Sequence, residues 1–319
     1  SSKLLDEVRI SLIQKQKKIL NKSLKILHIT NFNERFNGRL HYTTGKRINN
    51  GLIRLGHNVY QLSDRDVISS NRSILNPSSK KILNDKIIEI CKNFKPNLVI
   101  LGHADSVKVE TLEYLKKNNL NLKISQWFLD PLSRNGPDYI NNKKRILDKI
   151  KFIDATFLTS DPESLDFKIK NSFYLPNPCD SSFEVLNNYS KKCDNDLFFA
   201  MSHGVHRGVL KKGKIDAREN LIKKLINITP NIKFDFYGLN GHQPIWSDDF
   251  LKSLSQNKIG LNLSQGKSSN YYSSDRFSQL IGNGLLVMID KKTKIGDFFE
   301  KDEIITYNNI SDLSEKIIK

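Results

Sequence analysis

The sequence predicts an α/β protein built from two doubly wound domains. Two observations lead to this prediction. Short apolar runs alternate with amphipathic helical patterns along the whole chain, and a proline-containing stretch interrupts this alternation once. Alternating strands and helices are typical of parallel sheets covered by helices. The length of 319 residues suits two domains, because a domain commonly has roughly 150 residues.

In the first half of the chain, each expected strand is a short, mostly apolar run, and each expected helix has apolar residues three or four positions apart. The expected strands are Lys25–Thr30, Val59–Leu62, Leu98–Leu101, Ile124–Phe128 and Ala155–Leu158. The expected helices are Ile48–Leu55, Ile82–Phe94 and Val107–Lys117. These elements make one complete domain, which we expect to occupy residues 1–177.

The interruption is the stretch from Tyr174 to Asp180, which contains Pro176 and Pro178. Proline continues neither a helix nor a central strand, so a linker is expected here and a second domain at residues 178–319. Its expected strands are Leu197–Met201, Phe234–Tyr237, Ile259–Leu263, Leu285–Ile289 and Ile304–Tyr307, and its helices are Arg218–Ile228, Asp249–Leu254 and Arg276–Ile281. Two such Rossmann-like domains are expected to face a central cleft at the carboxyl ends of their strands, where open α/β sheets bind ligands.

The chain is strongly basic, with 51 Lys and Arg residues, 34 Asp and Glu residues and a net charge of +17. A polyanionic partner would explain this charge, and so would lysines spread over solvated faces. Basic residues concentrate locally only in the first 25 positions, which form an amphipathic pattern. Such a helix packs on its own domain or makes a peripheral contact with an anionic membrane surface, for example the inner face of a cell membrane. No motif that reads nucleic acid is present, so nucleic acid is not an expected partner.

Other composition features exclude several classes of protein. No apolar run approaches the roughly 20 residues of a membrane-spanning helix, and no signal-peptide pattern is visible. The three cysteines, Cys91, Cys179 and Cys193, form no C-x-x-C pair. A disulfide scaffold and a structural zinc site are therefore not expected. We expect the protein to occupy a reduced, cytoplasmic compartment.

The segment Gly266–Gly284 follows an expected strand and leads into an expected helix. Ser273 and Ser274 stand where a helix cap would fall, and the free amides of a helix start attract phosphate. Arg276 could bind the same anion through two parallel hydrogen bonds, whereas Asp275 would repel it and suits ribose or sugar hydroxyls. A serine cap beside a surface arginine is the alternative interpretation.

A second segment, Ala200–Arg218, also connects an expected strand to an expected helix. It holds three glycines among five Lys and Arg residues, a composition that suits a clamp for a diphosphate. It matches neither G-x-G-x-x-G nor the Walker A pattern. A solvated basic loop is therefore the alternative.

The second domain resembles the CgeB-like (spore-maturation-protein type) glycosyltransferases, within the GT-B superfamily and glycosyltransferase group 1. The motifs that carry this resemblance are the glycine- and arginine-bearing loop after Leu197–Met201, Phe236-Tyr237-Gly238, Lys258–Leu263, Ser274–Phe277 with Gly282–Gly284, and the closing Phe298-Phe299, Glu303-Ile304, Tyr307 and Leu313. They cover most of residues 195–319. Over the first domain, only the order of strands and helices matches.

The resemblance implies a metal-independent glycosyltransferase with a GT-B fold. The enzyme would move a sugar from a nucleotide-sugar donor, bound by the second domain, to a glycan or lipid-linked acceptor, bound by the first. The residues it implies for the donor are Ser202, Gly204, Arg207, Arg218, Tyr237, Gly238, Ser273, Ser274, Asp275, Arg276 and Gln279. Gln279 stands where these families usually have a glutamate, which leaves the donor open and favours the alternative of a non-catalytic module that binds a sugar or an anionic partner.

We expect this transfer to proceed without a metal or other cofactor. The leaving phosphate gains negative charge as the glycosidic bond breaks, and arginine side chains and helix-terminal amides can stabilise that charge in place of Mg²⁺. Asp64-Arg65-Asp66 has the spacing of a D-x-D metal motif, but we expect it in a loop with no second metal signal. No metal site is therefore predicted.

The candidate acceptor residues follow strands of the first domain. His103 comes after Leu98–Leu101 and Asp130 after Ile124–Phe128, and either could act as a general base or bind the acceptor sugar. Structural roles for both residues remain alternatives. A second group, Gly38, Arg39 and His41, occupies the first loop, which we expect at the rim of the cleft.

Overall fold

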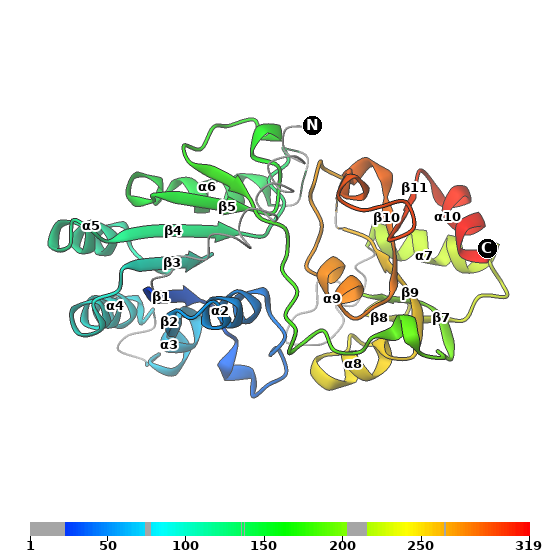
Figure 1. The fold of residues 1–319 in the computed structure, drawn as a ribbon, viewed down its shortest axis with the longest axis horizontal. Coiled ribbons are helices and arrows are strands. Elements are labelled where there is room, and N and C mark those ends of the chain that lie inside the picture. The colour runs from blue at the N-terminus through cyan, green and yellow to red at the C-terminus, as the bar shows by residue number, and fades with distance from the viewer. Residues whose placement is uncertain (1–22, 74–77, 135, 137, 203–215, 265) are drawn as a thin grey trace. The chain divides into compact units, whose positions relative to one another are not determined.

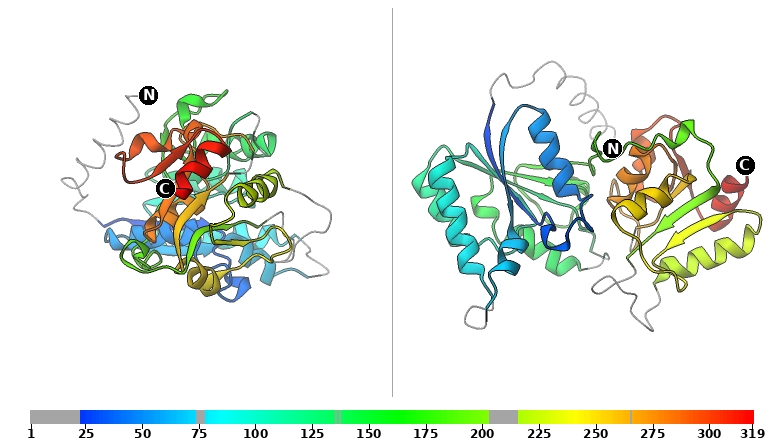
Figure 2. Two further views of the ribbon diagram at one scale, coloured as in Figure 1. Left: turned by 90° about the vertical axis from the view of Figure 1, so that its right-hand side faces the viewer. Right: turned by 90° about the horizontal axis from the view of Figure 1, so that it is seen from below.

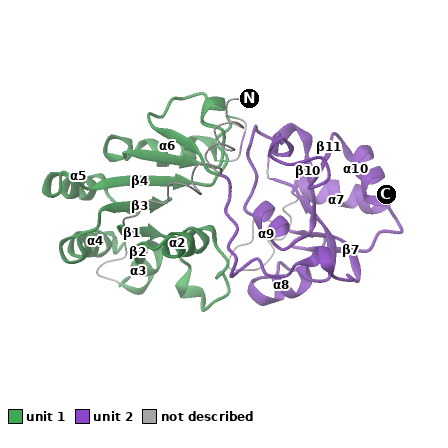
Figure 3. Ribbon diagram, viewed as in Figure 1, with its two compact units in different colours: residues 1–134, 138–175 green, residues 135–137, 176–319 purple. Residues whose placement is uncertain are grey.

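The computed structural model describes residues 23–73, 78–134, 136, 138–202, 216–264 and 266–319. The chain divides into two compact units, residues 1–134 with 138–175 (unit 1) and residues 176–319 with 135–137 (unit 2) (Figure 3). The break between Leu175 and Pro176 lies close to the boundary expected after residue 177. The expected amino-terminal amphipathic helix lies almost entirely outside the described residues.

Unit 1 is built on a six-stranded parallel sheet with the strand order β2-β1-β3-β4-β5-β6 (Figure 1). The strands are β1 (Lys25–Thr30), β2 (Asn58–Ser63), β3 (Leu98–Gly102), β4 (Lys123–Phe128), β5 (Ala155–Leu158) and β6 (Ser172–Tyr174). The chain passes from β1 to β2 on one side and then to β3 on the other side of β1. The strand order therefore reverses between β1 and β3, and ligands bind at the carboxyl end of such a reversal point.

The helices of unit 1 cover both faces of this sheet (Figure 2). They are α2 (Thr44–Arg54), α3 (Asp64–Ser70), α4 (Lys80–Phe94), α5 (Val109–Asn118) and α6 (Tyr139–Leu147). Neighbouring side chains of a strand point to opposite faces. Leu27 of β1 accordingly packs in the core formed with α3, α4 and α5, while Ile26 packs in the cluster that Ile48 of α2 joins.

Unit 2 has a five-stranded parallel sheet with the order β11-β10-β9-β7-β8. Its strands are β7 (Asn195–Ala200), β8 (Phe234–Tyr237), β9 (Asn257–Asn262), β10 (Leu286–Asp290) and β11 (Ile305–Tyr307), and its helices are α7 (Ala217–Ile228), α8 (Ser247–Leu254), α9 (Arg276–Gly282) and α10 (Ile310–Ile318). Both β8 and β9 pair with β7, so the reversal point lies between β7 and β9. Helices α7 and α10 pack on one face, and α8 and α9 on the other.

The predicted fold class, two doubly wound α/β domains, is confirmed. Every expected strand is present, with its ends within two residues of the prediction. The elements β6, α3, α6 and α10 were not expected from the sequence. The expectation that Asp64 and Asp66 lie in a loop is wrong, because they begin α3. No helix in the described part of the chain is long and apolar enough to cross a membrane.

Candidate active site

In unit 2, Arg276 lies across the carboxyl ends of β7 and β9. Its Nε donates a hydrogen bond of 2.7 Å to the carbonyl of Ala200, the last residue of β7. Its Nη1 donates one of 3.0 Å to the carbonyl of Leu263, directly after β9, and the guanidinium lies 5.1 Å from the centre of the Phe199 ring. These contacts hold the guanidinium at the reversal point of the sheet, where doubly wound folds bind ligands.

The charge of Arg276 is only partly compensated. Burial, and after it the neighbouring Arg218, lowers its pKa to about 10, so the guanidinium is still charged at neutral pH. Within the described residues, no carboxylate lies within ion-pair distance of Arg276 and its Nη2 has no hydrogen-bond partner. A fixed cation with unused donors is suited to an anion such as a diphosphate.

Ser274 and Asn262 extend this site. The hydroxyl of Ser274 donates to Oδ1 of Asn262 over 3.0 Å and accepts from Nη1 of Arg276 over 3.4 Å. Asn262 is 2% exposed, and its Nδ2 has no partner among the described residues. A buried donor without a partner costs about 1–3 kcal/mol, so the amide of Asn262 is well placed to donate to a ligand oxygen.

The residues next to Arg276 differ from expectation. The predicted serine cap is wrong, because Asp275 occupies the N-cap position of α9 and makes no capping hydrogen bond with its side chain. Asp275 is exposed, and Ser273 is buried with its carbonyl accepting from Asn177. Gln279 is half-buried, and its carboxamide has no hydrogen-bond partner in the described part of the chain.

The other predicted arginine, Arg218, is engaged within the protein. Its Nε and Nη2 bind the two carboxylate oxygens of Asp216 at 2.9 and 2.8 Å, and the same carboxylate caps α7. Ser202 is exposed after β7. Gly204 and Arg207 lie outside the described residues, so their predicted contacts with donor phosphates stay predictions.

Gly238 and Tyr237 shape the end of β8. Gly238 has a φ of +78°, and a Cβ there would lie 1.6 Å from the carbonyl oxygen of Met201, so only glycine lets β8 end this close to β7. The Tyr237 ring packs near Phe198, with 6.3 Å between ring centres, and burial raises its pKa. Tyr237 therefore contributes to the core over α8 and α9.

In unit 1, the structure brings together the two residues predicted as catalytic. Nδ1 of His103 lies 3.8 Å from Oδ2 of Asp130. The imidazole stacks on Phe128 with 4.3 Å between ring centres, and its Nε2 accepts from the amide of Leu129 over 3.4 Å. His103 also has a φ of +59°. Such strained conformations gather at functional sites.

The environment of His103 favours its neutral form. Burial is the largest influence and lowers the pKa of the imidazole, while the carboxylates of Asp130 and Asp105 raise it and the cations of Arg65 and Arg145 lower it again. The balance leaves the pKa below its ordinary value of 6.5. A histidine that is unprotonated at neutral pH can accept a proton, as a general base must.

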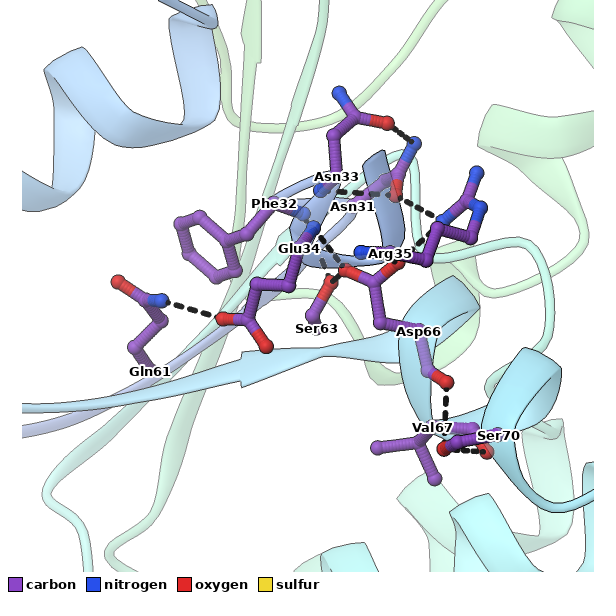
Figure 4. Close-up of polar contacts among 10 residues, drawn as sticks. All are labelled: Asn31, Phe32, Asn33, Glu34, Arg35, Gln61, Ser63, Asp66, Val67 and Ser70. Atoms are coloured by element: carbon purple, nitrogen blue, oxygen red, sulfur yellow. Dashed lines mark hydrogen bonds and ion pairs between the residues drawn. The ribbon is translucent and has the colours of Figure 1, made fainter. Parts of the chain in front are cut away.

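The second acid of the D-x-D motif, Asp66, anchors the loop after β1 (Figure 4). Its carboxylate accepts from the amides of Glu34 and Arg35, at 2.8 and 3.3 Å, from Nη1 of Arg35 and from the hydroxyl of Ser63. Burial raises the pKa of Asp66, but these hydrogen bonds outweigh it and leave the pKa below its usual value. Asp66 is therefore a loop anchor.

The first acid of the motif, Asp64, lies in a different environment. It is 2% exposed, burial raises its pKa, and its Oδ1 has no partner among the described residues. Asp64 and Asp66 thus do not act as one chelating pair. In the described part of the chain, no group of three or more His, Cys, Asp or Glu side chains is arranged to hold a metal ion.

The tip of the anchored loop carries the remaining predicted residues. Gly38, Arg39 and His41 are exposed, and Gly38 has a φ of +87° with nothing within 4 Å of where a Cβ would stand. The His41 ring contacts Tyr42 edge to face at 5.3 Å. The loop therefore has a fixed base and an exposed tip at the carboxyl edge of the unit 1 sheet.

Part of unit 2 is similar to a known family of proteins. Residues 217–319 match the protein family described as glycosyl transferase-like. This match covers α7 to α10 and includes Asn262, Ser274 and Arg276. No curated protein matches the chain.

Several solved structures are similar over most of the chain. The α,α-trehalose 6-phosphate synthase of Burkholderia multivorans aligns with a TM-score of 0.50 and 8% identity, covering 93% of this chain and 90% of that one. The apo structure of OtsA gives 0.50 and 9%, covering 92% and 90%. T4 phage BGT in complex with UDP and Mn²⁺ gives 0.46 and 12%, covering 92% and 90%. At such low identity the likeness is one of fold, and the two Rossmann-like domains expected for a GT-B protein are confirmed.

Proposed function

We propose that this chain is a glycosyltransferase that binds a nucleotide-sugar donor at unit 2 and uses unit 1 to bind and activate the acceptor. The glycosyl transferase-like family match supports an enzyme of glycosyl transfer. The CgeB-like subtype, and with it a glycan or lipid-linked acceptor, rests on the motifs of residues 195–319. A cytoplasmic location is part of the same proposal.

One observation carries the proposal for unit 2. The Arg276 guanidinium is fixed at the reversal point of the sheet by the carbonyls of Ala200 and Leu263, and its Nη2 is unused in the described residues. The diphosphate of the donor gains negative charge as its bond to the sugar breaks. A hydrogen-bond donor that is already fixed at that place stabilises the charge without rearranging. Such a donor commonly lowers the barrier by about 2.7–4 kcal/mol. The Nδ2 of Asn262 adds a neutral donor beside it.

Unit 1 supplies the acid–base step in this proposal. The acceptor oxygen attacks the anomeric carbon, the bond from that carbon to the diphosphate breaks, and the proton lost by the acceptor hydroxyl passes to the pair formed by His103 and Asp130. The neutral imidazole and the adjacent carboxylate support this role. The exposed residues Gly38, Arg39 and His41 are proposed to contact the acceptor.

We propose that the reaction proceeds without a metal ion, with Arg276 stabilising the leaving diphosphate. The hydrogen bonds of Asp66 support this, because four donors already occupy the carboxylate of the acid that a D-x-D site would use. Transfer rates should therefore be the same with EDTA and with added Mg²⁺ or Mn²⁺. A rate that collapses in EDTA and returns with Mn²⁺ would contradict this part of the proposal.

The central test is calorimetry of the full chain with UDP, GDP, ADP, CDP and TDP in EDTA. At least one of these nucleotides should bind, and Arg276→Gln should weaken that binding on the order of 100-fold or more. Arg276→Lys should keep part of the affinity, since lysine retains the positive charge but cannot donate two parallel hydrogen bonds to the diphosphate. Lys252→Gln, an exposed charge removed from α8, should leave the affinity unchanged. No binding by any nucleotide, or equal affinity in Arg276→Gln, would overturn the proposal.

A non-catalytic binding module is the second candidate function. Gln279 favours it, because its half-buried carboxamide can bind a sugar hydroxyl but carries no charge. Donor hydrolysis measured with the wild-type chain separates the two functions. Nucleotide binding with no hydrolysis and no transfer would support the module, whereas turnover that depends on His103 would support the transferase.

A further inference from the structure

Three charged side chains surround the His103–Asp130 pair without taking part in the proposed reaction. Arg145, on α6, lies with Nε 3.5 Å from Oδ2 of Asp105 and with Nη1 3.8 Å from Oδ2 of Asp130. Arg65, on α3, lies with Nη2 3.4 Å from the same oxygen of Asp105. One guanidinium thus bridges the carboxylates that follow β3 and β4.

Arg145 and His103 share a single oxygen atom. Nη1 of Arg145 and Nδ1 of His103 are each 3.8 Å from Oδ2 of Asp130. The side chain of Asp130 is 45% exposed, and within the described residues Arg145 is the only permanently charged cation within ion-pair distance of its carboxylate. Asp130 therefore depends on Arg145 for its position, because an exposed carboxylate without a fixed partner can turn toward solvent.

The charges that face His103 come from four different parts of unit 1. They are Asp130 after β4, Asp105 after β3, Arg65 on α3 and Arg145 on α6. The two carboxylates favour the imidazolium form of His103, and the two arginines oppose it. Removal of one arginine leaves an excess of negative charge beside a ring that is largely buried.

We propose that Arg145 is a positioning residue for the acid–base pair: by bridging Asp105 and Asp130, it holds Asp130 beside His103 and prevents the two from becoming a full ion pair. The inference rests on the proposed function only in assigning the pair to catalysis. The bridge itself rests on the distances above. Arg145 touches neither of the reacting atoms in this proposal and acts through Asp130.

The first experiment follows the imidazole of His103 by NMR as a function of pH in the full-length protein, with the signal assigned by its loss in His103→Gln. In Arg145→Gln the titration midpoint should rise by about one pH unit. Arg145→Lys should give a smaller rise. Arg134→Gln is the matched control, because Arg134 is 80% exposed and pairs with Asp166 instead, and its midpoint should equal that of the wild type.

The opposite change should come from Asp105→Asn. It removes one of the carboxylates that favour imidazolium, so the midpoint of His103 should fall. This second variant keeps the inference testable if Arg145→Gln does not fold. A midpoint in Arg145→Gln or Arg145→Lys equal to that of the wild type, or one that does not fall in Asp105→Asn, would overturn the inference.

The second experiment measures transfer with the same variants. Arg145→Gln should lower kcat with little change in the KM for the donor, and the acid limb of the pH–rate profile should move upward by the same amount as the NMR midpoint. Recovery in Arg145→Lys would agree with a positioning role. The NMR titration needs neither donor nor acceptor, so a shifted midpoint with no dependence of turnover on His103 would contradict the proposed function and leave the Arg145 bridge intact.

Discussion

Units 1 and 2 both reverse their strand order beside the first strand, but the charges at the carboxyl ends of their strands differ. In unit 1, the charges at that edge are balanced around a neutral imidazole, with Asp105 and Asp130 opposite Arg65 and Arg145. In unit 2, the guanidinium of Arg276 has no ion-pair partner in the described residues. The topology determines where a ligand binds, and the side chains after each strand determine the chemistry.

The largest expected effect tests this division directly. His103→Ala should reduce the transfer rate by roughly 10²–10⁴-fold, the usual contribution of a general base, while calorimetry shows unchanged donor affinity. Arg276→Gln should reduce donor affinity instead. If His103→Ala weakens nucleotide binding as strongly as Arg276→Gln does, the separation of roles between the two units is wrong.

One glycine at the end of a strand in each unit extends the comparison to the backbone: Gly238 after β8 in unit 2 and Gly102 in β3 of unit 1. Gly238→Ala should lower the free energy of unfolding of unit 2 by about 3 kcal/mol or more, because the new Cβ meets the backbone of Met201 at a positive φ. Gly102→Ala places its Cβ 2.1 Å from the Trp127 ring, which is a side chain that can shift. The cost in unit 1 should be smaller, about 1–3 kcal/mol.

Urea unfolding can follow each unit separately, since Trp127 lies in unit 1 and Trp246 in unit 2. Trp246→Phe and Trp127→Phe backgrounds isolate the fluorescence of the other tryptophan. A larger loss in Gly102→Ala than in Gly238→Ala would mean that the close approach of β8 to β7 relaxes more easily than the structure implies.

Acid should destabilise unit 1 before unit 2. Burial lowers the pKa of His28 to about 4 from 6.5, so between these values the unfolded chain binds a proton that the folded unit 1 does not. The free energy of unfolding should therefore fall as the pH drops through this window, by about 3 kcal/mol in total. Fluorescence of Trp127, which donates to His28 over 3.2 Å, reports the transition.

Replacing His28 with Gln should abolish this acid dependence, and replacing the exposed His41 with Gln should preserve it. Melting curves of the two variants at pH 7 and pH 4.5 provide the measurement. A His28→Gln protein that loses as much stability in acid as the wild type would assign the effect to other groups.

The smallest expected effect concerns the start of α7. Asp216→Ala removes the helix cap and the partner of Arg218, and it should lower the stability of unit 2 by about 1–2 kcal/mol. Glu315→Ala, an exposed change on α10, serves as control. Nucleotide affinity should stay the same or rise, because the freed Arg218 gains the ability to bind phosphate. A large loss of affinity would show that the Asp216–Arg218 pair shapes the donor site.

The sequence predicted the sheets well, because buried parallel strands are continuous apolar runs such as Leu98–Leu101. It also singled out His103 and Asp130, each two positions after such a run, and the structure places the two side chains 3.8 Å apart. It missed α3 and α6, whose sequences lack a regular apolar stripe: α3 has only Val67 and Ile68, and α6 buries Asn142 with Ile146.

Contacts between residues that are far apart in the sequence could not be predicted from the sequence. Asp66 accepts a hydrogen bond from the amide of Glu34, 32 positions away, and Nε of Arg145 on α6 lies 3.5 Å from the carboxylate of Asp105 after β3. The unpaired amide of Asn262 also appears only in three dimensions, although its place at the end of β9 was a signal that could have singled it out. Local patterns encode strands and the residues that follow them, whereas ion pairs between elements depend on the packed fold.

The anchored base of the loop after β1 has a consequence for engineering. Asp66 and Ser63 hold the backbone at Phe32, Glu34 and Arg35, so the segment beyond them can vary without disturbing the sheet. Residues 37–41 should therefore tolerate substitution without loss of the fold. Libraries randomised only there should keep the parental melting temperature, so they can test the proposed acceptor contacts of Gly38, Arg39 and His41.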